Sequence, residues 1–246
     1  MRIALLSDIH GNREALTACL NHAGRSRIDR FVFLGDYVGY GADPVFVIET
    51  VMEHVARGAV ALLGNHDAAV IEPDPSMTDA AFTALDWTRG RLGATHLAFI
   101  KGLRVCWEDG GRLYVHASAH APGEWGYVTG HYSASKSLMA TTAQATFCGH
   151  THVPMLFHMS MTGKIASFEP VDRVDIPLMA RRRWLAVIGS VGQPRDHNPA
   201  ACYAILDTAR SILTYIRVPY DVDTAARKIR DAGLPIELSF RLAEGY

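Results

Sequence analysis

The stretch Ala61-Leu62-Leu63-Gly64-Asn65-His66-Asp67 is the most informative in the chain, because an apolar run breaks at a glycine and three polar side chains follow. Such a run is typical of a buried strand that feeds a turn at the rim of a sheet. In open α/β folds, ligands bind at that rim, beyond the carboxyl ends of the strands. Taken alone, the stretch has a second interpretation, in which Asn65 and Asp67 only form the turn and His66 is incidental.

Four other apolar runs end in the same way, and this favours a binding site over a turn. The side chains at the five ends are Asp8 and His10, Asp36, Asn65 and His66, His116, and His150 and His152. In extended backbone, residues two apart point to the same side, so we expect Asp8 and His10 to converge. More nitrogen and oxygen donors gather at these ends than one ion requires, and two ions about 3.5–4 Å apart would share a carboxylate. Asp36, alone at the end of a central strand, is the expected bridge.

The order of the predicted elements indicates an α/β fold with a parallel sheet. Strands at residues 2–7, 30–34 and 60–63 alternate with helices at 13–23 and 44–56. A helical insert is expected at residues 68–101 and a helical segment at 219–246. After residue 153 the predicted strands are short and closely spaced, which favours a second, more antiparallel sheet. No linker interrupts the sequence, so we expect one domain over residues 1–246.

Composition excludes several classes of protein. The chain has 246 residues, of which 49% are hydrophobic and 20% charged, as in an ordinary globular protein. Its formal net charge of -1 offers no basic surface for bulk nucleic-acid binding. The first apolar run, residues 1–6, is too short for a signal peptide or a membrane span, so we expect a cytoplasmic protein without a membrane partner.

The five blocks together resemble the calcineurin-like metallophosphoesterase superfamily. They are Asp-x-His, Gly-Asp, Gly-Asn-His-Asp, a single His and Gly-His-x-His, complete and in order within residues 1–218. The opening Asp8-Ile9-His10-Gly11-Asn12 and the length are most similar to the small bacterial phosphodiesterase branch. The resemblance implies a four-layer α-β-β-α sandwich of two mixed sheets flanked by helices, with a dinuclear metal site at the strand ends.

The resemblance also implies a role for each residue of the blocks. One ion would be held by Asp8, His10, Asp36 and His152, and the other by Asp36, Asn65, His116 and His150. A hydroxide bridging the ions would attack phosphorus in line. His66 would face the leaving-group oxygen, and Asp67 would orient His66 through its other ring nitrogen. The donors suit two divalent or trivalent ions, with Mn, Fe, Zn, Ni and Co all acceptable.

These features predict a phosphodiesterase that acts on small nucleotide-like diesters. Asn12 and Arg195 are the candidates for substrate binding. Protein phosphatases of the superfamily follow Gly-Asp with an arginine-containing element that grips phosphate, and the loop after Asp36 has no arginine. A phosphomonoesterase or protein phosphatase is the alternative, and a non-catalytic scaffold of the same fold is less favoured, because every motif residue is present. The expected partner is a small phosphoester substrate. The sequence leaves open whether the chain forms a homo-oligomer.

Overall fold

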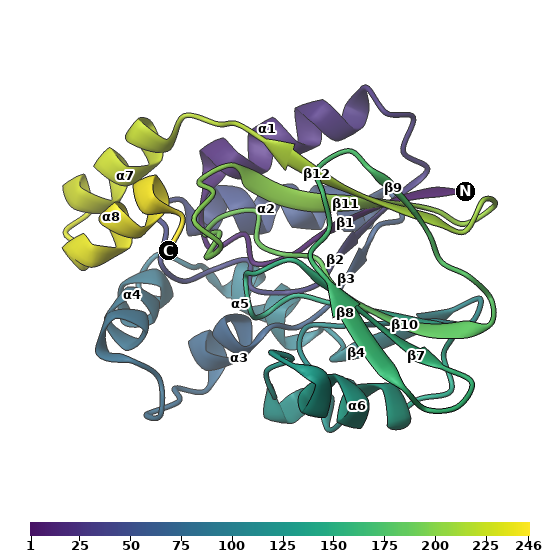
Figure 1. Cartoon of the computed structure of the whole chain (residues 1–246). Coiled ribbons are helices and arrows are strands. Elements are labelled where there is room, and N and C mark those ends of the chain that lie inside the picture. Colours follow the sequence, from purple (N-terminus) through teal and green to yellow (C-terminus); the bar gives the residue numbers. More distant parts are fainter.

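Two six-stranded mixed sheets form the centre of the computed structural model, which describes residues 1–246 (Figure 1). The first sheet has the order β3 (Val60–Ala61), β2 (Arg30–Phe33), β1 (Arg2–Leu6), β11 (Ala201–Asp207), β12 (Ile212–Val218) and β9 (Asp175–Pro177). The second has the order β4 (Cys106–Asp109), β5 (Arg112–Val115), β6 (Ala145–Cys148), β10 (Arg182–Val187), β7 (Met155–Ser160) and β8 (Ile165–Phe168).

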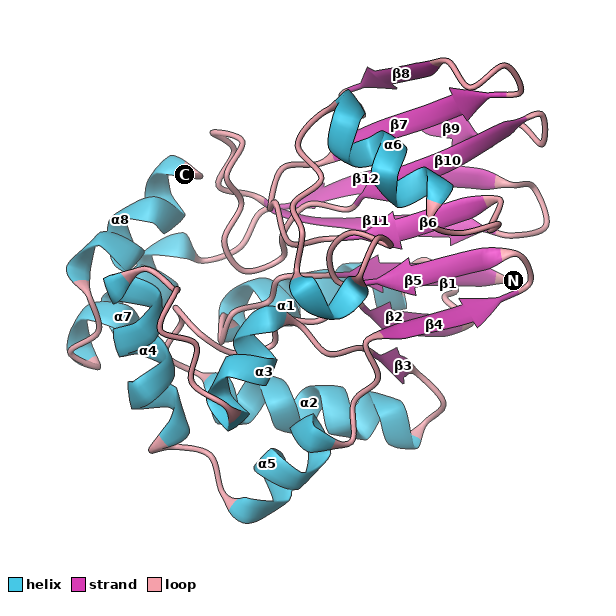
Figure 2. Cartoon of the chain, turned by 90° about the horizontal axis from the view of Figure 1, so that it is seen from below, coloured by secondary structure: helices cyan, strands magenta, loops and turns pink.

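Helices cover the outer face of each sheet and complete the predicted four layers. Helices α1 (Arg13–Gly24) and α2 (Pro44–Ala56) pack on the first sheet, and α6 (His131–Met139) packs on the second. Figure 2 shows α6 lying across the strands of the second sheet. The predicted fold class, two mixed sheets flanked by helices, is confirmed.

Apart from Arg2 at its start, strand β1 consists of apolar residues that are buried on both faces of the sheet. Ile3 and Leu5 join the core between the two sheets, whereas Ala4 and Leu6 join the core under α1 and α2. Successive side chains of a strand point to opposite faces, so a strand between two cores has no polar face. The sheets therefore hold β1 and the chain leaving it firmly in place.

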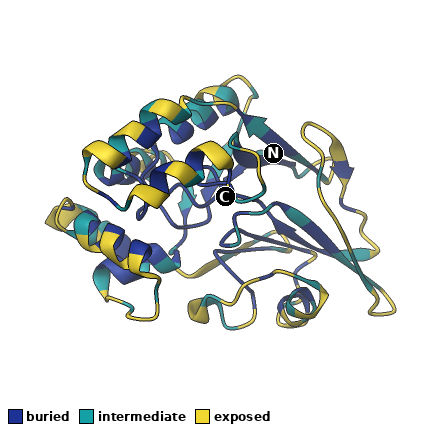
Figure 3. Cartoon of the chain, turned by 60° about the vertical axis from the view of Figure 1, so that its left-hand side comes forward, coloured by how far each residue is buried: buried dark blue, intermediate teal, exposed yellow.

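Five further helices lie beside the sheets. They are α3 (Asn65–Ile71), α4 (Asp79–Arg89), α5 (Ala94–Lys101), α7 (Val222–Asp231) and α8 (Ile236–Glu244). Ala84 of α4 shares a hydrophobic cluster with Ile229 of α7 and Leu238 of α8. The inner sides of these helices are buried and their outer sides exposed (Figure 3). The predicted insert and C-terminal segment thus pack against each other.

The predicted separate sheet after residue 153 is wrong. Strands β7, β8 and β10 extend the sheet of β4, β5 and β6, but β9, β11 and β12 complete the sheet of β1. Strand β11 runs antiparallel to β1 over Arg2–Leu5. A local sequence pattern predicts a strand but not its partner, since pairing depends on edges left open far away in the chain. Strands β8 and β9, which are short and largely exposed, were not predicted.

Candidate metal centre

The five predicted strand ends meet where the two sheets adjoin. Asp8 and His10 follow β1, and Asp36 follows β2. Asn65 and His66 begin α3 after β3, His116 follows β5, and His150 and His152 follow β6. All of these side chains are buried except that of Asn65, which is half-buried. Every residue that the sequence predicts as a metal ligand therefore lies in one place.

Five of these residues have left-handed backbone, contrary to the expectation that Asp8 and His10 lie in extended backbone. Asp8, His10, Asp36, His150 and His152 have φ values of 55°, 49°, 57°, 67° and 61°. This left-handed region is uncommon for residues other than glycine and clusters at functional sites. At these five residues the side chains converge because the chain turns sharply, and alternation along a strand plays no part.

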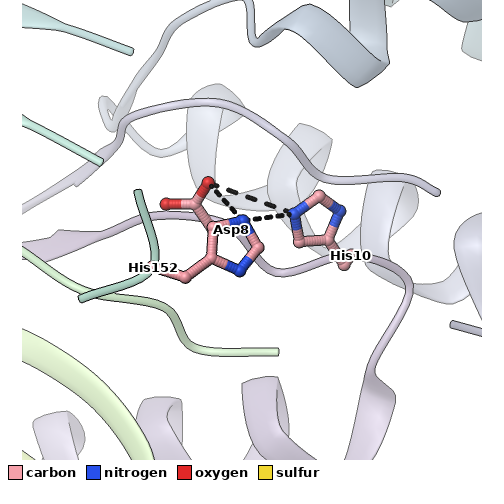
Figure 4. A group of neighbouring side chains, drawn as sticks. All are labelled: Asp8, His10 and His152. Atoms are coloured by element: carbon pink, nitrogen blue, oxygen red, sulfur yellow. Dashed lines mark hydrogen bonds and ion pairs between the residues drawn. The ribbon is translucent and has the colours of Figure 1, made fainter. Parts of the chain in front are cut away.

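The first group of donors consists of Asp8, His10 and His152 (Figure 4). Nε2 of His152 lies 3.3 Å from Oδ1 of Asp8 and 3.1 Å from Nε2 of His10. Nε2 of His10 lies 4.0 Å from the same carboxylate oxygen. Three donor atoms thus surround one point.

The second group consists of Asp36, His116 and His150. Nε2 of His116 lies 3.3 Å from Oδ2 of Asp36 and 3.1 Å from Oδ1 of Asn65. The same oxygen of Asp36 lies 3.6 Å from Nε2 of His10 in the first group. Asp36 is therefore placed between the two groups, as a bridging carboxylate would be.

Backbone carbonyls fix the orientation of three of the imidazoles. Nδ1–H of His10 donates to the oxygen of Val38 at 3.0 Å, and Nδ1–H of His152 donates to that of Gln193 at 2.6 Å. His116 donates in the same way to Leu34 at 2.9 Å. A ring that carries its only proton on Nδ1 directs the lone pair of Nε2 to the centre, which is the arrangement found around protein-bound metals.

Charge and burial in the first group also fit a cation. Burial lowers the pKa of His10 well below its usual value and also lowers that of His152, so both rings are neutral. Two Nε2 lone pairs that face each other have no donor between them, and a cation would satisfy both. The buried Nε2 of His150 likewise has no hydrogen-bond partner.

His116 is the exception among the imidazoles. Burial lowers its pKa, but the carboxylates of Asp36 and Asp8 outweigh burial and raise the pKa to about 9. In the metal-free chain, a proton thus sits on the ring nitrogen that faces Asp36 and Asn65. Metal ions compete with protons for such nitrogens.

His66 lies beside both groups. Its ring is edge-on to His10, with the centroids 4.8 Å apart, and its backbone N–H donates to Oδ1 of Asp36 at 2.8 Å. Burial lowers the pKa of His66 to about 4. The ring also lies close enough to His10 and Asp36 to form a third possible group of donors.

The expected contact between Asp67 and His66 is wrong. Oδ2 of Asp67 accepts from the backbone N–H of Asp36 at 2.7 Å and of Gly64 at 3.0 Å. Oδ1 accepts from Tyr37 at 2.9 Å, while Nδ1 of His66 has no partner. Because Asp67 lies in the first turn of α3, its carboxylate turns back to the strand ends. It holds the backbone that carries Asp36 in place.

The side chain of Asn12 makes its hydrogen bonds to other residues of the chain, contrary to the expected contact with substrate. Its Oδ1 accepts from the N–H of Ala15 at 3.0 Å and caps α1, as asparagine commonly does at this position. Its Nδ2 donates to Gly192 at 2.9 Å and to the hydroxyl of Tyr220 at 3.2 Å.

Arg195 remains a candidate for substrate binding. The guanidinium donates to Oε1 of Gln193 at 2.9 Å and to the hydroxyl of Tyr40 at 3.4 Å. Its positive charge contributes to the low pKa of His66 and of His152, which places it beside the centre.

Three aromatic side chains next to the centre were not among the site residues predicted from the sequence, although the loop at residues 121–130, which carries two of them, was expected to bear on substrate identity. The ring of Tyr40 lies 4.6 Å from those of both His10 and His66. Tyr127 stacks on His150 at 4.0 Å, and Trp125 lies edge-on to His116 at 5.9 Å. All three lie in glycine-containing loops, and a lone aromatic residue in a loop carries no signal of what it contacts.

Comparison with known proteins agrees with this site. The chain matches the family of calcineurin-like phosphoesterases over residues 1–154. It is 32% identical to an uncharacterized protein from Methanocaldococcus jannaschii, over 99% of this chain and 98% of that protein. The crystal structure of a metallophosphoesterase from Sphaerobacter thermophilus is 35% identical, with a TM-score of 0.88 over 100% of this chain and 99% of that one.

A second solved structure shows the same fold. A hypothetical protein from Pyrococcus horikoshii is 21% identical and has a TM-score of 0.80, over 100% of this chain and 98% of that one. None of the helices of the chain is long and apolar enough to cross a membrane.

From the family match and the site, the chain belongs to the calcineurin-like phosphoesterase family and is a metal-dependent phosphoester hydrolase.

Proposed function

We propose that the chain is a phosphodiesterase that uses two divalent or trivalent metal ions to hydrolyse small nucleotide-like diesters. The observation that carries the proposal is the pair of buried donor groups on either side of Asp36. We assign Asp8, His10, Asp36 and His152 to one ion, and Asp36, Asn65, His116 and His150 to the other. Manganese is among the metals that such mixed donors accept.

The ions and the protein have separate parts in this proposal. Bound ions would supply positive charge to the phosphoryl oxygens and make a water molecule more acidic. The carbonyls that accept from Nδ1 of His10, His116 and His152 keep each Nε2 directed to the centre. Asp67 holds Asp36 in position through the backbone. Ligands held by such contacts lose little freedom when ions and substrate bind.

His66 and Arg195 are proposed to act on the substrate. We place His66 next to the leaving-group oxygen, because its buried ring borders both donor groups and Nδ1 has no partner in the chain. Arg195 would contact a non-bridging phosphoryl oxygen while Gln193 and Tyr40 hold its guanidinium. One guanidinium matches the single charge of a diester.

Hydrolysis of bis-p-nitrophenyl phosphate and of p-nitrophenyl phosphate tests the proposal. We expect the diester to be the better substrate by kcat/KM when Mn²⁺, Fe²⁺, Zn²⁺, Ni²⁺ or Co²⁺ is added, and a chelator to abolish turnover. Asp36→Asn should lower metal binding together with activity. His66→Ala should lower kcat while metal binding is retained. Faster turnover of the monoester would replace the proposal with a phosphomonoesterase, and undiminished activity in both variants would refute this assignment of roles.

The extent of the functional unit is also a proposal. We infer that residues 1–246 act as one domain, because a single hydrophobic cluster joins Ala4 of β1, Leu85 of α4 and Val218 of β12. A cytoplasmic location stays a prediction from the sequence.

A further inference from the structure

We propose that a cavity beside the metal centre binds the uncharged aromatic group of the phosphoester substrate, such as the base of a nucleoside. The inference rests on the proposed function and adds the class of substrate. The cavity has a volume of about 520 Å³ and lies between α3, the end of α5 and the loop that carries Trp125. Sites for small organic ligands commonly have volumes of about 300–1,000 Å³.

The cavity begins at the metal centre. Asn65 lines the cavity, and its side-chain oxygen lies 3.1 Å from Nε2 of His116. Trp125 also lines it, with its ring edge-on to that of His116 at 5.9 Å. A phosphoryl group bound beside His116 would therefore have one of its ester substituents directed at the cavity.

The walls of the cavity suit a flat aromatic ring. Ala68, Ile71 and Pro73 provide apolar surface, and Trp125 provides a half-buried indole. The backbone of Trp125 has a φ of 54°, in the left-handed region that a bulky residue seldom adopts. Bases stack on aromatic side chains of this kind because every base has a π-face.

The charged side chains that line the cavity disfavour a further phosphate group there, in addition to the one at the metal centre. Glu72 and Asp74 contribute two carboxylates, and Lys101 contributes the one cation of the lining. Oδ1 of Asp74 accepts from the N–H and the hydroxyl of Ser76, which leaves Oδ2 for another donor. A polyphosphate would meet net negative charge here, whereas an N–H group of a base, such as N3–H of thymine, could donate to a carboxylate. An uncharged heteroaromatic ring is thus the occupant that fits.

Two diesters with the same leaving group and the same charge test the inference. They are the p-nitrophenyl ester of thymidine 5′-phosphate and methyl p-nitrophenyl phosphate. We expect wild type to prefer the thymidine ester by kcat/KM. In Trp125→Ala the ratio of the two kcat/KM values should fall about tenfold or more, and Trp125→Phe should restore most of it. Tyr132→Ala, in which a tyrosine 80% exposed on α6 is removed, is the control and should leave the ratio unchanged.

Thymidine binding, measured by calorimetry with a chelator present, gives a readout that needs no turnover. We expect wild type and Trp125→Phe to bind thymidine and Trp125→Ala to lose binding. An equal ratio in wild type and Trp125→Ala, or thymidine binding that Trp125→Ala retains, would overturn the inference. If wild type binds thymidine through Trp125 but hydrolyses neither diester with any of the metals, the proposed function fails and the cavity assignment stands.

Discussion

Gly64→Ala tests whether the turn before α3 positions the metal centre. A Cβ added at Gly64 would overlap Oδ1 and the backbone nitrogen of Asp36. Gly93 offers a matched control, because it is the N-cap of α5 as Gly64 is of α3, with φ of -82° against -101°. A Cβ at Gly93 would meet only Nδ1 of His96, at 3.9 Å, which is an ordinary contact.

The comparison isolates the cost of the overlap. Alanine is a poorer N-cap than glycine, which destabilises each variant by about 1 kcal/mol. Alanine also reduces the conformational freedom of the unfolded chain, which stabilises each variant by about 1 kcal/mol. Both effects are the same in the two variants. Forcing extra atoms into a packed site typically costs about 1–3 kcal/mol. We therefore expect Gly64→Ala to lower the free energy of unfolding by about 2 kcal/mol relative to Gly93→Ala. Asp36 must also shift, so metal affinity should fall about 10–100-fold.

Two measurements check this expectation. Urea unfolding in the presence of a chelator gives the stability difference without any contribution from metal. Calorimetric titration with Mn²⁺ gives the affinity. Equal urea midpoints and equal Mn²⁺ affinities in the two variants would refute the argument that Gly64 is required for close approach to Asp36.

Three further predictions concern metal binding and stability. Mn²⁺ at 100 times its Kd should raise the free energy of unfolding by about 2.7 kcal/mol, measured by urea unfolding with Mg²⁺ and chelator controls. Asp67→Asn should weaken Mn²⁺ binding about tenfold in a calorimetric titration, because a hydrogen bond to the backbone around Asp36 is lost, whereas His66→Ala should change that affinity little. Lys228→Met should lower stability by about 1 kcal/mol in urea at pH 7, because Lys228 bonds to Glu14 at 2.6 Å and Asp43 at 2.8 Å.

The stabilisation that Lys228 gives to the folded state decreases at high pH. Burial lowers the pKa of Lys228, but its hydrogen bonds to Asp43 and Glu14 outweigh burial and raise it above the ordinary value of 10.5. A raised pKa in the folded state stabilises the fold fully below pH 10.5, and the effect is lost as pH rises through the folded value. The stability difference between wild type and Lys228→Met should therefore shrink above that pH.

Each of these predictions has an opposing outcome. Unfolding midpoints that are the same with Mn²⁺ and with chelator would argue against a metal site that exists only in the folded chain. Unchanged Mn²⁺ affinity in Asp67→Asn, together with a loss of kcat equal to that of His66→Ala, would restore the interpretation that Asp67 acts through His66. A Lys228→Met difference that grows above pH 10.5 would contradict the assigned ion pairs.

The sequence predicted the elements around the centre because their signals are local. An apolar run, a glycine and a polar side chain occur within a few residues at the ends of β1, β2 and β6. The Asp43-Pro44 start of α2 is just as local, and the structure places Asp43 at the N-cap. Such features depend on neighbours in the chain and need no knowledge of the fold.

What the sequence did not predict depends on distant contacts. Strand β11 pairs with β1 across about 200 residues, and no local pattern specifies that partner. The carboxylate of Asp67 binds the backbone around Asp36, about 30 residues away, instead of the adjacent His66. Trp125 becomes a wall of the cavity only when its loop folds against the end of β5.

The left-handed backbone at five of the proposed ligands bears on how this chain can evolve. A residue with a side chain costs about 1–2 kcal/mol more than glycine in that conformation, so the five together approach the whole stability of a typical domain. Selection for stability alone would favour glycine at Asp8, His10, Asp36, His150 and His152. Each of those changes would relieve the backbone and remove a donor, so a lineage that lost its substrate should lose these side chains early. Replacing one of these residues of this chain by glycine should therefore relieve the backbone and weaken metal binding together.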